Sequence, residues 1–445
     1  MISETKYNDK SIKSIISFAK RMENKTIKEL TGLQNISHLK SDTNKGLLGT
    51  IIEEFYFRYK PNNTNKADFE KAGLELKTTP LKKTKKGSRA KERLVFSIID
   101  YMSLIYEDWE SCSFLEKNKL ILLIFYLWEK DKEILEYIIK YVTLWNVTSH
   151  DFEIIRQDWE IIVKKVKNGK AHEISEGDTK YLAACRKGAG GNSDWRNQPN
   201  SSIKALQRAF SFKPKYMNVI LDILQEKDDF DRVTKTTDLK KTSFEEVIYS
   251  KLNKFKGLSF DEICMKLNIG KPSAKHKAYI LTAKMLGAKK GKVEEFEKAD
   301  IEVKTITLEK TGNLKEAMSF KNFKYVDIIE EADWEDSPVR EMFEKKFLFV
   351  IFKKDNYNIP RFERAMFYNL PYSDLMEVKK VWAKVKTNTK NGIYTNISSL
   401  ENPVAHVRNK GADSKSMYPT PDGKTAKKRC FWLNREYIYK VITNE

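Results

Sequence analysis

Hydrophobic and polar positions along the chain predict helices and strands in an order that occurs twice. Apolar residues recur at helical spacing over residues 9–33 and again over 45–59, which predicts helices at the start of the first half. Alternation of apolar and polar residues then predicts strands, and an amphipathic stretch that stops at a glycine predicts a longer helix. These later elements are expected at residues 73–81, 93–101, 119–128 and 151–168.

A repeated segment gives the clearest sign of duplication. EKAGLELKTTPL at residues 70–81 returns as EKADIEVKTITL at residues 297–308, an offset of 227. Further echoes follow in the same order, and several echoes in one order indicate one fold built twice. They pair 121–131 with 347–355, and 208–221 with 429–442. We therefore expect a first domain at 1–226, a charged linker at 227–242 and a second domain at 243–445.

The charge of the chain narrows the class of partner. Lys and Arg number 82 against 62 Asp and Glu, so the formal charge is +20. This excess favours a polyanion, with double-stranded DNA or RNA ahead of an anionic membrane. No window approaches the ~18 apolar residues of a membrane span, and the first residues lack a signal-peptide core. We therefore expect a cytoplasmic protein that does not use a membrane.

Cysteine and histidine residues do not indicate a metal site. The four cysteines lack Cys-x-x-Cys spacing and the five histidines are scattered, so neither structural zinc nor a disulfide is favoured.

The first repeat carries residues suited to phosphodiester hydrolysis. Glu75 and Lys77 leave the same face of the predicted strand, and a bend at a glycine can bring Asp68 beside Glu75. Carboxylate oxygens, with the carbonyl of Leu76, suit Mg²⁺, and Glu53 on the preceding helix is a third candidate acid. A lysine beside such a site can orient an attacking water or neutralise charge on the phosphate.

Each of these residues also has an ordinary explanation. A solvated amphipathic strand accounts for Glu75 and Lys77, and Glu53 reads equally well as an exposed helix acid. The duplication favours the functional interpretation.

These residues resemble a known nuclease family. KGLLGTIIE at 45–53, Asp68 and GLELKT at 73–78 are similar to the MutH mismatch-repair nickase, and equally to the two-domain type II restriction endonucleases related to MutH that cut at GATC. The resemblance continues through 109–119, 156–169 and 181–188. It implies an α/β fold with two tandem restriction-endonuclease-like domains, each a mixed β-sheet flanked by helices.

The resemblance also implies roles for individual residues. Glu53, Asp68 and Glu75, with the Leu76 carbonyl, would hold Mg²⁺. Lys77 would be the motif lysine and Lys117 the second active-site lysine, although nothing else in the sequence singles out Lys117.

For DNA recognition, the family uses a basic loop that follows a Tyr-Leu strand. Arg186 and Lys187 occupy that loop here, where a long basic side chain can reach guanine in the major groove. The alternative for both is a phosphate contact that carries no sequence information. Lys213 and Lys215 are further candidates for phosphate contacts.

The second repeat keeps only part of the catalytic set. Glu302 and Lys304 are retained, with Glu295 in the position of Asp68. Ala283 falls near the position of Glu53, and Met342 or Glu344 at that of Lys117. We therefore expect a degenerate site, and the resemblance implies an effector domain that binds a second DNA site. Arg408 and Lys410 offer a DNA-reading loop, and the alternative is a scaffold that only completes the core.

Three functions stay open at this point. The first is a Mg²⁺-dependent type II restriction endonuclease that cuts GATC and works beside a cognate DNA methyltransferase that it need not bind. It would cut both strands either by transient dimerisation on DNA or by two sequential nicks. The second is a non-catalytic sequence-specific DNA-binding protein, and the third is a mismatch-repair nickase. The presence of all five candidate catalytic residues in one half disfavours the second, and the duplicated length disfavours the third.

Overall fold

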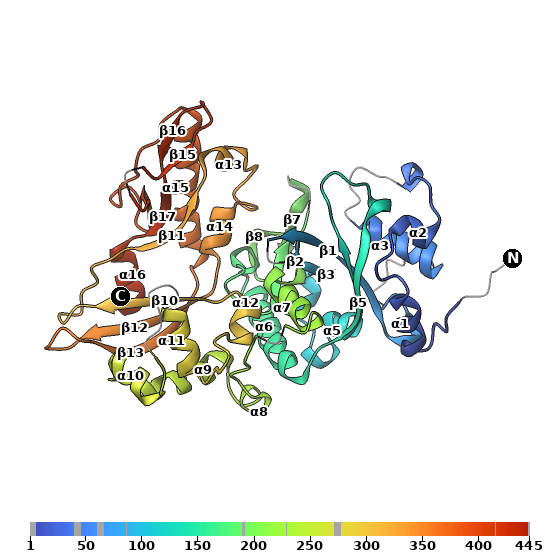
Figure 1. Cartoon of the computed structure of the whole chain (residues 1–445), viewed down its shortest axis with the longest axis horizontal. Helices are drawn as coiled ribbons and strands as arrows, with labels where there is room; N and C mark the ends of the chain where they lie inside the picture. The colour runs from blue at the N-terminus through green and yellow to red at the C-terminus, as the bar shows by residue number, and fades with distance from the viewer. Residues whose placement is uncertain are drawn as a thin grey trace.

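The computed structural model places the two halves of the chain side by side. It describes residues 6–39, 46–59, 66–85, 87–188, 192–227, 229–270, 277–413 and 415–443. The first half forms one end of an elongated molecule and the second half the other, so the chain termini lie at opposite ends (Figure 1). Within these ranges, no helix is long and apolar enough to cross a membrane.

The main sheet of the first half is mixed. Strand β1 (Glu75–Thr84) runs parallel to β4 (Leu120–Leu127), β5 (Ile138–Asn146) is antiparallel to β4, and β2 (Gly87–Ala90) pairs with β1 at the edge. The strand β4 is a nearly continuous apolar run because core clusters cover both of its faces.

The second half repeats this pairing. Strand β10 (Glu302–Leu308) runs parallel to β12 (Phe347–Lys354), and β13 (Pro360–Tyr368) is antiparallel to β12. Glu75 pairs with Ile121 in the first ladder and Glu302 with Phe347 in the second, so the two Glu-x-Lys triplets occupy the same place in their sheets. The predicted duplication and the mixed α/β fold are confirmed.

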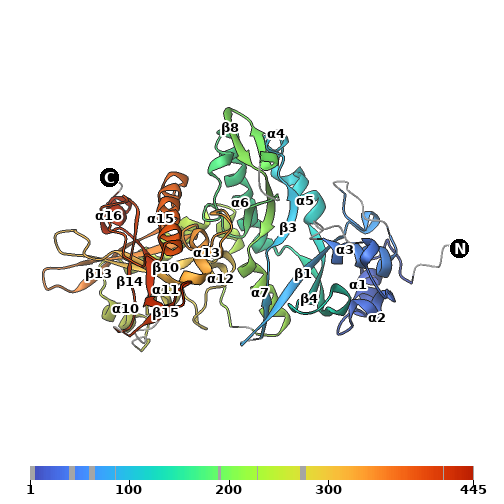
Figure 2. The same cartoon turned by 90° about the horizontal axis from the view of Figure 1, so that it is seen from above.

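A smaller antiparallel sheet and a hairpin accompany each main sheet. The strand order β3-β9-β6 in the first half corresponds to β11-β17-β14 in the second. The hairpins are β7-β8 and β15-β16, and β7-β8 projects from the molecule beside α4 (Figure 2). The strands are β3 Leu94–Ile98, β6 Leu182–Arg186, β7 Trp195–Gln198, β8 Ser201–Leu206, β9 Arg208–Phe212, β11 Met318–Phe323, β14 Ala405–Asn409, β15 Met417–Pro419, β16 Thr425–Lys427 and β17 Arg429–Leu433.

The helices follow the same duplication. Helices α6 (Ser149–Lys167) and α15 (Tyr372–Lys390) are both 19 residues long, and α5 (Ser113–Asn118) and α14 (Pro338–Phe343) are both six. The others are α1 Ile12–Lys20, α2 Ile27–Thr31, α3 Leu47–Ile51, the π-helix η2 Ile52–Phe57, α4 Tyr101–Leu104, α7 Pro214–Leu224, α8 Thr236–Leu239, α9 Phe244–Leu252, α10 Phe260–Lys266, α11 Lys277–Met285, α12 Glu294–Ala299, α13 Tyr325–Glu330 and α16 Arg435–Thr443. Short 3₁₀ turns are η1 Ser37–Leu39, η3 Glu70–Ala72, η4 Trp109–Ser111, η5 Ile134–Glu136, η6 Ala171–Glu173, η7 Asn192–Asp194 and η8 Asn253–Phe255.

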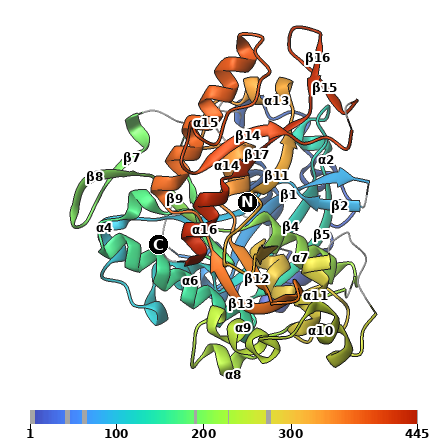
Figure 3. The same ribbon diagram turned by 90° about the vertical axis from the view of Figure 1, so that its left-hand side faces the viewer.

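The two halves share one hydrophobic core. A single cluster of buried residues extends from Leu81 in β1 to Phe362 in β13, and α7 of the first half packs against α12 of the second. Figure 3 views the molecule from the second half, with the sheets of the first half behind it. The charged segment 227–242 joins this contact, because Val233 and Leu239 within it are buried. Much of the predicted linker is therefore packed between the halves.

A buried polar seam adds to this interface. Lys298 of α12 donates to Asp151 of α6 at 2.7 and 2.9 Å, and the Tyr216 hydroxyl donates to the same carboxylate at 2.8 Å. Burial by itself raises the pKa of Asp151, but hydrogen bonds from His150 and the charge of Lys298 outweigh it and leave the pKa below its ordinary value. The seam is thus an ionised and paired network between the halves.

Candidate metal-nuclease site and DNA interface

A tight turn before β1 brings two acids together. The turn η3 ends at Gly73, whose φ of 62° is in the left-handed region that favours glycine. The chain therefore doubles back, and Asp68 comes to lie beside Glu75. The Asp68 amide donates to Glu75 Oε2 at 3.2 Å, and the Leu76 amide donates to Asp68 Oδ2 at 2.8 Å. The predicted approach of these two carboxylates is confirmed.

Both candidate lysines lie at the same oxygen of Glu75. Lys77 Nζ is 2.6 Å from Glu75 Oε1, and Lys117 Nζ is 3.7 Å from that atom. Lys117 reaches it from α5, which leads into the strand that runs parallel to β1. The side chain of Glu75 is only 2 % exposed, so both ammonium groups act on a carboxylate that water barely reaches. The lysine implied only by family resemblance therefore lies in the cluster.

Glu53 completes a group of three acids. It lies in the π-helix η2, which continues from α3, and α3 packs against β1. A methyl group added at Gly49 would meet Thr78 Oγ1 at 3.6 Å and Glu53 Oε1 at 3.9 Å, which are ordinary contacts. Burial, and then the charge of Asp68, raises the pKa of the Glu53 carboxyl to about 7. The charges of Asp68 and Glu75 thus both act on the Glu53 carboxyl.

The cluster suits a hard divalent cation in composition and in charge. Its donors are oxygens, which Mg²⁺ prefers. With every group ionised, three carboxylates against two ammonium groups give −3 + 2 = −1 within this set. Burial also raises the pKa of Glu75; the charge of Lys77 opposes this rise and the charge of Asp68 adds to it.

The Tyr59 hydroxyl is a further buried polar group whose pKa the acids of this cluster affect. It is buried without a hydrogen-bond partner, and burial followed by the charge of Asp68 raises its pKa. Among the described residues, no group of three His, Cys, Asp or Glu side chains is placed so that it could hold a metal ion. Lys77 and Lys117 both lie at the Glu75 oxygen that a cation would need. The Leu76 carbonyl remains a predicted ligand.

The residues proposed to contact DNA divide into accessible and inaccessible groups. Lys187 is exposed at the end of β6, while Lys215 is half exposed and lies 4.0 Å from Asp300. Arg186 turns toward the second half, where its guanidinium pairs with Asp333 at 3.1 Å.

The interpretation of Lys213 as a phosphate contact is wrong for this conformation. Its side chain is buried, and Nζ donates to the carbonyls of Glu176 and Thr179, each at 2.8 Å. Burial, the largest effect, lowers the pKa of the ammonium group.

The second half keeps its Glu-x-Lys pair and builds different surroundings. Lys304 Nζ lies 2.7 Å from Glu302 Oε1. Glu295, expected beside this pair, instead accepts hydrogen bonds from the Val233 and Thr234 amides and is fully buried at the interface between the halves. Its inclusion in the degenerate site is therefore wrong, because the chain uses this acid to hold segment 227–242.

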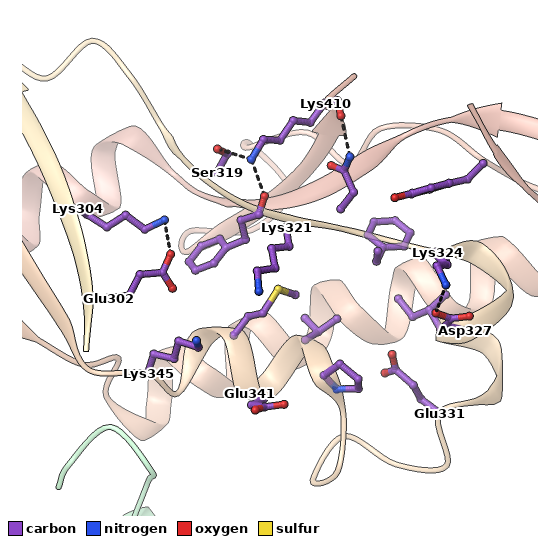
Figure 4. Close-up of a pocket in the computed structure, with 18 residues that line it drawn as sticks. Glu302, Lys304, Ser319, Lys321, Lys324, Asp327, Glu331, Glu341, Lys345 and Lys410 are labelled. Carbon is purple, nitrogen blue, oxygen red and sulfur yellow. Dashed lines mark hydrogen bonds and ion pairs between the residues drawn. The ribbon is translucent and has the colours of Figure 1, made fainter. Parts of the chain in front are cut away.

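Asp300 and Lys345, which the sequence analysis did not identify, form an ion pair near Glu302 and Lys304 instead. Lys345 Nζ lies 3.0 Å from Asp300 Oδ2, and Lys345 lines the same cleft as Glu302 and Lys304 (Figure 4). Asp300 occupies the left-handed position that Gly73 has in the first repeat, with φ of 53°. Lys345 follows α14, one turn beyond the residue that corresponds to Lys117. The repeat aligns Asp300 with Gly73, but it gives no indication of Lys345.

The remaining second-half residues singled out in the sequence lie on the elements that correspond to those of the first half. Met342 is the fifth residue of α14, as Lys117 is the fifth of α5, and Ala283 is buried in α11. Arg408 is exposed and stacks on Trp432, with its guanidinium carbon 3.8 Å from the ring centre. Lys410 lines the cleft and donates to Ser319 Oγ at 2.9 Å and to the Phe320 carbonyl at 2.7 Å.

Comparisons with known proteins agree with this picture. The family described as the DNA mismatch repair enzyme MutH matches residues 57–158 and 286–384, one region in each half. The type II restriction enzyme Sau3AI of Staphylococcus aureus is 34% identical over 95% of this chain and 96% of its own length. The DNA mismatch repair protein MutH of Shewanella woodyi is 27% identical and covers 49% of this chain with 94% of its own.

Proposed function

The chain belongs to the family of MutH-related type II restriction endonucleases and is a site-specific deoxyribonuclease, and from this premise we propose that its first half performs Mg²⁺-dependent hydrolysis of double-stranded DNA at GATC. The observation that carries the assignment to the first half is the convergence of Glu53, Asp68 and Glu75 beside two lysines. The second half has only one of these acids, Glu302, in the corresponding place.

Each residue has a task in this proposal. Asp68, Glu75 and Glu53, with the Leu76 carbonyl, hold Mg²⁺, which when bound makes a water easier to deprotonate and stabilises charge on the phosphate. Lys77 lies against Glu75, so its ammonium group can donate to the attacking water and orient it. Lys117 approaches from another element and can neutralise charge that develops on the phosphate oxygens.

Specificity would come from the loop after β6. Lys187 is exposed there and can read guanine, whereas Arg186 must leave Asp333 before it can contact a base. Lys215 is accessible for a phosphate contact near the junction of the halves.

The second half is proposed to bind another GATC site as an effector. It retains the fold and a cleft with exposed lysines but lacks counterparts of Glu53 and Lys117. Because one catalytic centre cuts one strand at a time, we propose that two molecules meet transiently on the DNA. A cognate DNA methyltransferase would protect host DNA, without necessarily binding this chain.

Cleavage of a supercoiled plasmid of known sequence tests the catalytic assignment. We expect linear product in Mg²⁺ with ends at GATC, and none in EDTA. Asp68→Ala and Lys77→Ala should abolish cleavage while retaining most DNA binding, because binding depends mainly on phosphate contacts. Lys379→Ala, an exposed lysine on α15, is the matched control. Persistent full activity in Asp68→Ala would refute the site.

The same digest separates the alternatives. A mismatch-repair nickase would give open circles that stop at one cut strand, especially at hemimethylated sites. A non-catalytic DNA-binding protein would give retarded but intact plasmid. For the effector role, plasmids with one and two GATC sites are compared, and equal cleavage rates would remove it.

A further inference from the structure

Several lysines line the cleft in the second half, whereas three acids outnumber two lysines in the first site. The cleft has a volume of about 490 Å³ and lies between β10, β11 and α14, with Lys304, Lys345 and Lys410 on its walls (Figure 4). Lys321 is exposed on β11 at the same cleft. These ammonium groups come from separate elements and surround one opening.

Two of the lysines that line this cleft are each paired with an acid. Glu302 pairs with Lys304 at 2.7 Å, and Asp300 pairs with Lys345 at 3.0 Å. With every group ionised, two carboxylates and two ammonium groups give −2 + 2 = 0, whereas the five residues of the first site give −3 + 2 = −1. Lys215 of the first half, 4.0 Å from Asp300, adds a further positive charge beside this set.

The ammonium of Lys345 is held firmly in its charged form. Burial alone lowers its pKa, but the nearby carboxylates of Asp300 and Glu302 outweigh burial and leave the pKa above its ordinary value. The acid that the repeat would supply as a second metal ligand, Glu295, is committed to Val233 and Thr234 elsewhere. The cleft therefore has a fixed cation, and Glu295 does not supply a second metal ligand beside Glu302.

Other acids around the cleft are also engaged. Asp327 lies 3.5 Å from Lys324, and Glu331 accepts hydrogen bonds from Trp382 at 2.6 Å and Ser337 at 2.7 Å. Glu341 remains exposed at the opening. These pairings limit the repulsion that a phosphate backbone would meet on entering.

We propose that the second half binds the phosphate backbone of duplex DNA in this cleft without a divalent metal, and that the Lys345 ammonium supplies there the charge that a metal ion supplies in the first half. This inference rests on the proposed function, in which the second half binds DNA. It goes further by naming the residue and by making the two halves differ in their need for metal. Occupancy of the effector half would then persist when metal is removed.

The test measures DNA affinity of the full chain with its first site disabled. The parent carries Asp68→Ala and Lys187→Glu, and binding to a GATC duplex is followed by fluorescence anisotropy in EDTA and in Ca²⁺. We expect similar affinity in both. Adding Lys345→Ala should weaken binding in EDTA about tenfold and reduce the slope of log K against log salt by about 1.

A second response distinguishes charge replacement from a general loss of fit. Lys345→Ala leaves Asp300 and Glu302 short of one positive charge, so Ca²⁺ should restore part of its affinity. Lys345→Arg should stay independent of metal, and Lys379→Ala on α15 should match the parent. Melting temperatures of all variants report whether each remains folded.

The possible failures are distinct. If the parent binds DNA only in Ca²⁺, the inference is overturned while DNA binding by the second half stands. If the parent fails to bind in either buffer, the effector role in the proposed function fails as well. If Lys345→Ala binds like the parent in EDTA, another group supplies the charge and the assignment to Lys345 is wrong.

Discussion

The pH dependence of the free energy of unfolding can show how much the buried Glu53 carboxylate destabilises the fold. Folding raises the pKa of its carboxyl from 4.5 to about 7, through burial first and the charge of Asp68 second. The folded chain therefore holds a proton that the unfolded chain releases between these pH values. The free energy of unfolding should fall as the pH rises through this window and remain lower above it. Glu53→Gln removes the titration and should remove this loss.

The size of the effect follows from the difference in pKa. A change from 4.5 to about 7 corresponds to about 3.4 kcal/mol. Glu53 is partly exposed, so solvent screening reduces the expected value to about 2 kcal/mol. At roughly 2.1 cal/mol/K of unfolding entropy per residue, this corresponds to a rise of about 2 °C in melting temperature for a chain of this length.

Thermal melting in EDTA at pH 4.5 and pH 8 tests this reasoning. Glu53→Gln should melt with the parent at the lower pH and about 2 °C above it at the higher pH. Mg²⁺ should stabilise the parent more than the variant, which should be inactive in plasmid cleavage. Glu330→Gln, at the exposed end of α13, controls for a general charge effect. A variant that melts below the parent at pH 8 would refute the view that Glu53 is confined among like charges.

Other variants separate the roles of individual lysines and acids. Lys117→Ala should slow plasmid cleavage by roughly 10²-fold with little change in melting temperature, and a wild-type rate would exclude it from the site. Glu302→Ala should leave the rate at a single site within about twofold, because it lies outside the first site; complete loss would mean that the active half is misassigned. Lys213→Met should lower the melting temperature, since buried carbonyls lose their donor at about 1–3 kcal/mol each, while the salt dependence of DNA binding stays unchanged; a changed salt slope would restore the phosphate contact. Asp333→Ala should tighten DNA binding in a gel shift with a stability change below about 1 kcal/mol, because it frees the Arg186 guanidinium; unchanged affinity would argue that Arg186 does not reach DNA.

Much of the fold could be predicted from the sequence because the repeated turns and strands are determined by residues that are neighbours along the chain. The two Glu-x-Lys strands both follow a turn that ends in the left-handed region, at Gly73 and at Asp300. Such features depend on neighbouring residues, so they can be read along the chain. Glu75, Lys77 and Asp68 were therefore placed correctly relative to one another.

The remaining site residues depend on contacts between distant segments. Lys117 lies 3.7 Å from Glu75 only because α5 feeds the parallel strand, and the residues alone gave no sign of it. Glu295 was misplaced because an acid at a repeated position can be used for a different contact, here with segment 227–242. Lys213 was misplaced for a similar reason: a charged residue after a strand is usually exposed, but three buried carbonyls surround this one. Lys345 was missed because it comes from the loop after α14.

The continuous apolar interior that runs from Leu81 to Phe362 has a practical consequence for protein engineering. A catalytic module cut out at segment 227–242 would present to water the side of α7 that now packs on α12, and the Asp151 carboxylate would lose its ion pair with Lys298. Fusion of this nuclease to another DNA-targeting protein would therefore require redesign of that surface, or retention of the second half to cover it.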